Sequence, residues 1–330
     1  MSKIVVTGCA GLIGSHFTRH LLSRGHEVVG VDNLSGGHVE HVPPEVTFYK
    51  ADVTHADGVN DIFNEERPDF VYHFSAYAAV GLSPFIRNFN YMNNVVGSAN
   101  VINACVNSDV KKVVFTSSMD VYGSQVPPFD ETMTPRPEDP YGIAKYAVEQ
   151  DLHAAGRFFG LRYSIVRPHN VFGVYQNIWD KYRNVLGIWI RQILSGRPMT
   201  IYGDGSQVRS FSDVRYYMRP LEKLMSIGDG ETYNVGADKH MTIAEAADSV
   251  RKVAAKLGHS ADVVHLEPRD EVRVAFCDHT KAKTQLDFQD DTDFEKLVED
   301  MFVWAAKQPD RPIKTMPCEV KKNLYSFWCE

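Results

Sequence analysis

Short apolar runs alternate with amphipathic segments through the first half of the chain. Six runs rich in β-branched or aromatic residues predict strands at residues 3–6, 26–31, 46–49, 70–74, 112–116 and 163–167. Apolar positions with a helical period lie between several of them, at residues 16–24, 58–65, 94–106 and 141–159. This alternation predicts an α/β fold with a Rossmann-type, doubly wound parallel sheet.

The alternation is lost after about residue 168, where loops marked by proline and glycine become frequent. Helical periods return at residues 184–195 and 243–257. We therefore expect a first domain over residues 1–168 and a smaller C-terminal lobe over residues 169–330, partly interleaved with the first. Residues 314–330 show no clear period, and Phe327 and Trp328 suggest that they dock on the rest of the protein.

Composition excludes several classes of protein. The 330 residues carry a formal net charge of −7, which gives no electrostatic reason to expect nucleic acid or an anionic membrane as a partner. The five cysteines form no CxxC pair, so they indicate a reducing compartment and not a disulfide framework. Neither a leader segment nor a membrane-spanning run is predicted, and no metal-ligand spacing occurs among the 13 histidines. We expect a cytoplasmic protein without a metal.

The first strand is followed by three glycines, Gly8, Gly11 and Gly14, and then by a helical pattern. A strand, a glycine-rich turn and a helix start bring backbone N–H groups and the positive end of a helix to one point, which suits a pyrophosphate. Asp32 ends the second apolar run, about twenty residues after the glycines. A carboxylate there can accept both ribose hydroxyls and would repel a 2′-phosphate, so NAD is favoured over NADP.

A second group of residues points to proton transfer. Tyr141 and Lys145 are four residues apart in a helical segment, so both lie on one helix face. An ammonium group beside a phenol should lower the pKa of Tyr141 and make it a general base. Ser118, just after the fifth strand, could hydrogen-bond the same substrate oxygen. A packed tyrosine and a solvated lysine would explain the pair alone, but the combination with the glycines and the serine is more specific.

Taken together, these motifs resemble the extended short-chain dehydrogenase/reductase family, and within it the nucleotide-sugar epimerases. The resemblance covers nearly the whole chain. The matching stretches are residues 7–14, 32–37, 73–76, 93–94, 117–123, 140–145 and 167–170. The Asp-Asn-Leu-Ser-Gly-Gly segment at residues 32–37 is especially similar to UDP-glucose 4-epimerases.

The resemblance implies a mechanism. Tyr141 would take a proton from a sugar hydroxyl at C4, hydride would pass to NAD, and the transient 4-keto sugar would turn over and be reduced on its other face. Ser118 would hold the oxygen, and Lys145 would bind the nicotinamide ribose. The residues expected to bind NAD are Gly8, Gly11, Leu12, Ile13, Gly14, Asp32, Asn33, Ser35, Gly36, Asp52, Val53, Phe74, Ser75, Ala76, Asn93, Tyr141 and Lys145.

The resemblance also implies a UDP-sugar substrate, most simply of the glucose/galactose type, and a homodimer formed through helices of the first domain. The residues expected to contact substrate are Ser118, Met119, Asp120, Asn170, Asn184, Arg209 and Arg269. Arg209 and Arg269 would pair with the diphosphate, since guanidinium groups match phosphate oxygens. Solvated surface charges are the alternative for both arginines.

Three departures from the family pattern leave alternatives open. Asp120 lies where dehydratases and decarboxylases of nucleotide sugars carry a glutamate, so it is either a second acid/base or a bystander; Met119 replaces the aspartate that serves as acid in dehydration. Ala78 stands where some 4-epimerases carry a lysine. Residues 212–216 depart from the usual order and put the substrate pocket in question. A dehydratase, a decarboxylase and a non-catalytic NAD-binding protein are therefore the alternative functions.

Overall fold

A computed structural model describes residues 1–328 of the chain, so Cys329 lies outside the described residues. Its largest element is a seven-stranded sheet with the order β11-β6-β5-β4-β1-β2-β3. All neighbouring strands in it are parallel. The strands are β1 (Lys3–Thr7), β2 (Glu27–Asp32), β3 (Thr47–Lys50), β4 (Phe70–His73), β5 (Lys112–Thr116), β6 (Tyr163–Pro168) and β11 (Glu231–Val235). The Rossmann-type architecture is thereby confirmed.

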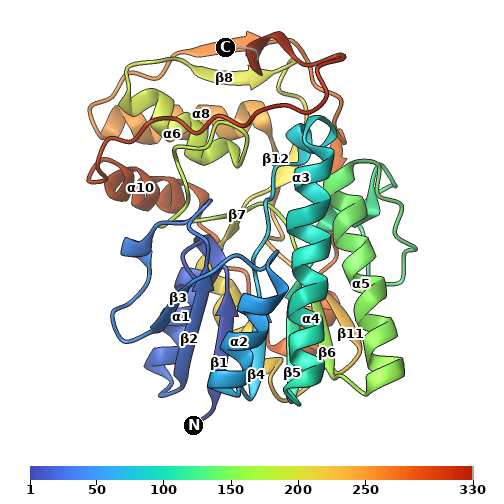
Figure 1. Ribbon diagram of the computed structural model, residues 1–330. Helices are drawn as coiled ribbons and strands as arrows, with labels where there is room; N and C mark the ends of the chain where they lie inside the picture. The colour runs from blue at the N-terminus through green and yellow to red at the C-terminus, as the bar shows by residue number, and fades with distance from the viewer. Residues whose placement is uncertain (329–330) are drawn as a thin grey trace.

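Helices cover both faces of this sheet (Figure 1). One face packs on α1 (Leu12–Ser23), α7 (Met218–Lys223) and α9 (Thr280–Leu286), and the other on α2 (Ala56–Glu66), α4 (Gly97–Asn107) and α5 (Pro140–Phe159). A short helix, α3 (Arg87–Tyr91), and one turn of π-helix (Met92–Val96) lead into α4. Because the sheet is covered on both faces, its strands are apolar runs without alternation, which is why they could be predicted.

The C-terminal lobe lies above the carboxyl ends of the strands (Figure 1). Its core is formed by α6 (Val185–Leu194), α8 (Ile243–Lys256) and α10 (Phe294–Ala305), with β8 (Met199–Tyr202) packed on them. The remaining strands are short: β13 (Val263–Leu266) pairs with β8, β12 (His240–Thr242) and β14 (Val274–Ala275) pair with β9 (Val208–Ser210), and β7 (Val171–Phe172) pairs with β10 (Ser212–Asp213).

Strand β11 was not predicted, although it lengthens the main sheet by pairing with β6. Its buried residues Tyr233 and Val235 alternate with more polar neighbours, so this edge strand lacks the continuous apolar run of the others. The chain therefore returns to the sheet more than sixty residues after the expected boundary at residue 168. The division into domains stays a prediction, with interleaving that includes β11, α7 and α9.

The C-terminal segment docks as its aromatic residues suggested. Trp328 packs edge-on against Phe85 and Tyr182, and all three belong to one buried cluster. Glu319 accepts hydrogen bonds from the backbone N–H groups of Asn88 and Phe89 at the start of α3. The segment thus runs from α10 across the C-terminal lobe to the top of α3 (Figure 1).

The order of the sheet reverses between β1 and β4, and backbone segments pass very close to one another there. A Cβ atom added to Gly8, whose φ is +72°, would lie 2.8 Å from the Ser75 nitrogen after β4. A Cβ atom on Gly14 would lie 2.1 Å from the Gly8 carbonyl oxygen. Only glycine allows α1 to start this close to the strand that precedes it.

We therefore expect Gly14→Ala to lower the free energy of unfolding by about 1–3 kcal/mol or more, because the added methyl group meets rigid backbone. Gly58→Ala is the matched control: Gly58 lies in α2 with nothing within 4 Å of an added Cβ atom. There the same change should stabilise the protein by about 0.5–1 kcal/mol. Urea unfolding of both variants measures the difference, and equal stabilities would contradict the close-packing argument.

Candidate functional site

A cavity of about 1390 Å³ lies between the carboxyl ends of the sheet strands and the C-terminal lobe. It exceeds the roughly 300–1,000 Å³ typical of a site for one small molecule, so it has room for two ligands. Every residue predicted to bind cofactor or substrate lines this cavity, with the exception of Asp52. The predicted residues that the site brings together are up to 261 positions apart in the sequence, from Gly8 to Arg269.

At one end of the cavity, the N-terminus of α1 fits a phosphate group. The helix begins at Leu12, inside the glycine motif and four residues earlier than predicted. Its N-cap residue, Gly11, has no capping side chain, so the first N–H groups of the helix remain available to an anion. A Cβ atom on Gly11 would meet only the Gly8 oxygen, at 3.3 Å, which leaves the space above the turn open.

Asp32 fits the ribose of such a cofactor. It is only 7% exposed and ends β2 beside the glycine turn. Its two oxygens accept hydrogen bonds from the N–H groups of Ala10 (3.0 Å) and Leu34 (2.8 Å), which fix the carboxylate at the cavity wall. Burial raises the pKa of Asp32, and these N–H groups oppose the rise. Each oxygen of a carboxylate can accept a further hydrogen bond from a ribose hydroxyl.

The contact between Asp52 and the cofactor stays a prediction. Asp52 does not line the cavity; it accepts a hydrogen bond of 2.8 Å from the side-chain amide of Asn33, which does. It also accepts hydrogen bonds from the N–H and hydroxyl of Thr54. Asp52 therefore orients Asn33, while its neighbour Val53 reaches the cavity.

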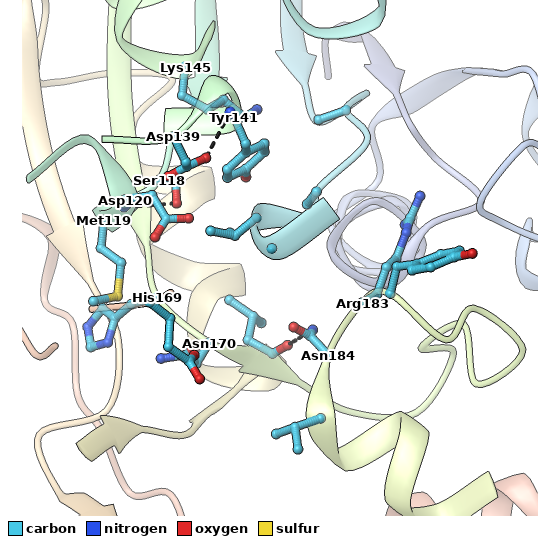
Figure 2. A pocket seen from close by; sticks show the side chains of 18 of the residues that line it. Ser118, Met119, Asp120, Asp139, Tyr141, Lys145, His169, Asn170, Arg183 and Asn184 are labelled. Atoms are coloured by element: carbon cyan, nitrogen blue, oxygen red, sulfur yellow. Dashed lines mark hydrogen bonds between the residues drawn. The ribbon is translucent and has the colours of Figure 1, made fainter. Parts of the chain in front are cut away.

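At the opposite end, the start of α5 places the candidate catalytic residues. Asp139 caps this helix by accepting hydrogen bonds from the N–H groups of Tyr141 and Gly142, and Pro140 occupies its first position. Tyr141 consequently enters the cavity on the first turn, and Lys145 follows one turn later. Figure 2 shows Tyr141, Ser118 and Asp120 grouped on one side of the cavity.

The expectation that Lys145 lowers the pKa of Tyr141 is wrong for this structure. The Lys145 ammonium donates a hydrogen bond of 2.8 Å to the Thr116 carbonyl oxygen and lies 5.9 Å from the centre of the Tyr141 ring. Burial raises the pKa of Tyr141, and the nearby carboxylate of Asp120 raises it further; Ser118 and Arg183 act in the opposite direction. Burial also lowers the pKa of Lys145 to about 7, and this desolvation outweighs the opposing effect of the Glu149 carboxylate.

Below this pair, a buried ion pair holds α5 to the sheet. Glu149 lies one turn after Lys145 and accepts two hydrogen bonds from Arg167 of β6, at 2.9 and 2.6 Å. Arg167 also donates to the hydroxyl of Tyr122 in the turn after Ser118. Glu149 favours the charged form of Lys145. The network thereby fixes the distance between α5 and the loop that carries Ser118.

Asp120 is a stronger candidate for proton transfer than the sequence suggested. Its N–H donates to the Ser118 hydroxyl oxygen at 3.2 Å, so the two residues share one tight turn. Burial, followed by the negative charge of Asp139, raises the pKa of Asp120 to about 7, against an opposing effect of Arg209. A carboxyl group that is largely protonated near neutral pH can donate a hydrogen bond as well as accept one.

The second lobe supplies the other wall of the cavity. Asn184 is the N-cap residue of α6, but its side-chain amide donates to the Val171 carbonyl oxygen at 3.0 Å, so the first N–H groups of α6 stay uncapped. Asn170 has a positive φ of +42°, and its amide nitrogen is buried without a hydrogen-bond partner among the described residues. A hydroxyl or phosphate oxygen of a ligand could accept hydrogen bonds from the first N–H groups of α6 and from the Asn170 amide.

The two predicted arginines line the cavity but are held by their own lobe. Arg209 donates to Glu271 and to the Val272 carbonyl oxygen, and burial lowers its pKa. The guanidinium of Arg269 lies 4.0 Å from the centre of the Tyr202 ring. Both can therefore present a fixed positive charge at the cavity wall. Their pairing with a diphosphate stays a prediction.

The atypical segment at residues 212–216 does not reach the cavity. Asp213 is buried and accepts hydrogen bonds from the backbone and guanidinium of Arg215, and Tyr216 donates to the Asp291 carbonyl oxygen. The departure from the family order is accommodated within this segment.

Several lining residues were missed. Asp139 could have been found, because aspartate before proline at the start of a helical period is typical of an N-cap. Arg183 and four residues of the C-terminal segment (Val320, Lys322, Asn323 and Tyr325) carry no local signal, since their positions depend on tertiary packing.

Across residues 1–328, no helix combines the length and apolar character needed to cross a membrane. Within the same range, no three side chains of His, Cys, Asp or Glu are grouped so that they could hold a metal ion.

Residues 4–236 match the NAD dependent epimerase/dehydratase family. The chain belongs to this family. One curated relative is UDP-glucose 4-epimerase of Bacillus subtilis. It is 30% identical to this chain, and the match covers 92% of this chain and 96% of that protein.

Solved structures of epimerases share the same fold. UDP-glucose 4-epimerase of Thermotoga maritima, solved with UDP-glucose, is 32% identical, has a TM-score of 0.87 and is matched over 92% of this chain and 99% of that chain. UDP-glucose 4-epimerase of Thermus thermophilus, solved with NAD, is 30% identical, has a TM-score of 0.85 and is matched over 92% and 98%.

The raised pKa of Asp120 predicts how stability depends on pH. The folded protein keeps a proton on this carboxyl up to about pH 7, whereas the unfolded chain releases it near the ordinary value of 3.8. Stability contributed by the protonated form is therefore lost as pH rises between these values. Relative to wild type, Asp120→Asn should gain stability from about pH 4 to pH 7 and then level off, as measured by urea unfolding. A difference that is constant over this range would contradict the raised pKa.

Proposed function

We propose that this protein epimerises a nucleotide sugar at C4 with NAD as a bound cofactor, and that the substrate is a UDP-sugar of the glucose/galactose type. The observation that carries the proposal is the placement of Tyr141 and Ser118 in the same cavity as the glycine turn and Asp32. The similarity to UDP-glucose 4-epimerases over more than nine-tenths of the chain supports the choice of reaction.

Each residue has a definite task in this reaction. Tyr141, as its phenolate, takes the proton of the sugar hydroxyl and becomes the neutral phenol, and the Ser118 hydroxyl hydrogen-bonds the same oxygen. Bound NAD would supply the acceptor, and afterwards the donor, of the hydride at the sugar carbon. Tyr141 then gives the proton back to the oxygen of the inverted product. Because desolvation disfavours the phenolate, groups that lower the pKa of Tyr141, such as Ser118 and Arg183, assist the first step.

The size and lining of the cavity suit the turnover of a keto sugar between the two hydride transfers. The nucleotide diphosphate must be held while the sugar rotates, and the uncapped start of α6, Arg209 and Arg269 lie on the lobe that would hold it. A single ligand of ordinary size would leave much of the space of about 1390 Å³ unfilled.

A dehydratase or decarboxylase of a nucleotide sugar is the second candidate, and the pKa of about 7 at Asp120 favours it. Such a group could exchange a proton with a second sugar carbon. Met119, however, cannot serve as an acid for the departure of water. The mass of the product separates the two, since epimerisation leaves it unchanged.

A homodimer and a cytoplasmic location also remain proposals. Apolar side chains on neighbouring helices support the dimer: Met92, Val96 and Ile143 are each about two-fifths exposed, at 44%, 38% and 41%. They lie on the π-helical turn before α4 and on α5, which contact one another.

Tyr141→Phe should lower turnover by roughly 10²–10⁴-fold, because it removes the proton-transferring hydroxyl and keeps the ring. NAD should still be bound, since the aromatic ring at position 141, Asp32 and the glycine turn are all retained. Product NMR with UDP-galactose measures turnover, and extraction of the purified protein measures NAD. Phe158→Ala, a change at a 67% exposed side chain of α5 that does not line the cavity, serves as a control for expression and handling. Near-normal activity of Tyr141→Phe would refute the mechanism.

A further inference from the structure

A cation from the C-terminal lobe reaches the loop that follows β2. The Arg183 guanidinium lies so close to Gly36 that a Cβ atom on this glycine would be 2.5 Å from its Nη2 atom. The same guanidinium lies 4.6 Å from the centre of the Tyr77 ring. Figure 2 shows Arg183 across the cavity from Ser118 and Asp120. Arg183 therefore faces the cofactor end of the cavity, although the chain reaches it only after β7.

The loop at residues 33–37 is held on the glycine turn, which brings Arg183 near the start of α1. A Cβ atom on Gly37 would lie 2.4 Å from the Ala10 carbonyl carbon, so the two backbones are in contact. Lys314 supports the loop from outside by donating a hydrogen bond of 2.6 Å to the Ser35 carbonyl oxygen. The Arg183 guanidinium thus lies against Gly36, and the next residue, Gly37, touches Ala10 of the glycine turn.

Arg183 is not fully used by its protein contacts. Its Nε atom lies 3.2 Å from Asp180 Oδ2, yet it makes no hydrogen bond of acceptable geometry within the part of the chain that the structure describes. Asp180 is also engaged by the Tyr77 hydroxyl at 3.3 Å. About one-fifth of the Arg183 side chain, 20%, remains exposed at the cavity wall. Its fork of donors is therefore available to a ligand.

Three of the other lining cations are held by contacts within the protein. Lys145 donates to the Thr116 carbonyl oxygen, Arg209 is bound to Glu271 and Val272, and Arg269 lies on Tyr202. The N-terminus of α1 contributes only a partial positive charge. This partial charge does not by itself balance the two negative charges of a diphosphate. An arginine fork beside it matches phosphate oxygens in both charge and geometry.

We propose that Arg183 binds the diphosphate of the dinucleotide cofactor and thereby lets the C-terminal lobe retain NAD. This inference rests on the proposed function only in that NAD occupies the cavity. The absence of a side chain at Gly36 is part of the arrangement, because any Cβ atom there would displace the guanidinium.

Arg183→Met tests the inference, since methionine keeps an apolar stem over Tyr77 and removes the charge. We expect the affinity of cofactor-depleted protein for NAD, measured by calorimetry, to fall by roughly tenfold to a hundredfold. Binding of UDP should stay within about twofold. Arg191→Met is the matched control, because Arg191 lies on α6 and pairs with Asp310, which is 86% exposed. Circular dichroism verifies that each variant is folded.

Gly36→Ala gives an independent arm, because it moves the guanidinium without removing it. The double variant with Arg183→Met should bind NAD no more weakly than the worse of the two single variants, as expected for residues that act through one contact. Full additivity would contradict the proposal. NAD affinity of Arg183→Met equal to wild type, or a loss confined to UDP, would overturn it. Failure of wild type to bind NAD would refute the proposed function itself.

Discussion

The close passage of three backbone segments at the reversal point of the sheet determines where everything else in the site can lie. The Gly8 turn, the start of α1 and the residues after β4 approach within distances that exclude a Cβ atom at Gly8 and Gly14. The uncapped N–H groups of α1 are consequently fixed at the edge of the cavity, in line with the carboxyl ends of β1 and β4. The residues expected to bind the cofactor and the candidate catalytic residues therefore share one cavity. Asp32 and the glycine turn form one part of its wall, and the start of α5 forms another.

Desolvation is the dominant electrostatic effect at the catalytic end. Burial shifts three pKa values so that the neutral form is favoured, those of Tyr141, Lys145 and Asp120. The pKa values of Lys145 and Asp120 thereby come to about 7. The buried pair of Glu149 and Arg167 partly compensates, because Glu149 favours a charged Lys145. Lys145 and Asp120 thus have similar proton affinities, whereas Tyr141 holds its proton much more tightly, so a base at this position needs groups that favour the phenolate.

The sequence predicted most of the fold and those lining residues that belong to the family motifs, and the rest was missed for physical reasons. Six strands were found because parallel strands buried on both faces are continuous apolar runs, whereas β11 at the sheet edge alternates and was missed. Motif positions identified residues that line the cavity but not their hydrogen bonds, such as the one that Asn33 donates to Asp52. Helical spacing put Lys145 beside Tyr141, but it could not reveal that the ammonium points to Thr116 or that burial controls both groups. Arg183 was beyond reach, since its proximity to Gly36 is created by the docking of one lobe on the other.

The central claim is that one hydride leaves the sugar carbon and returns to it inside a closed cycle. Incubation with UDP-galactose carrying deuterium at C4, followed by NMR and mass spectrometry of the product, tests this most directly. The account predicts UDP-glucose of unchanged mass that keeps the deuterium at C4, without added NAD and without accumulation of reduced cofactor. Loss of the deuterium to solvent, or a product lighter by water or carbon dioxide, would contradict it.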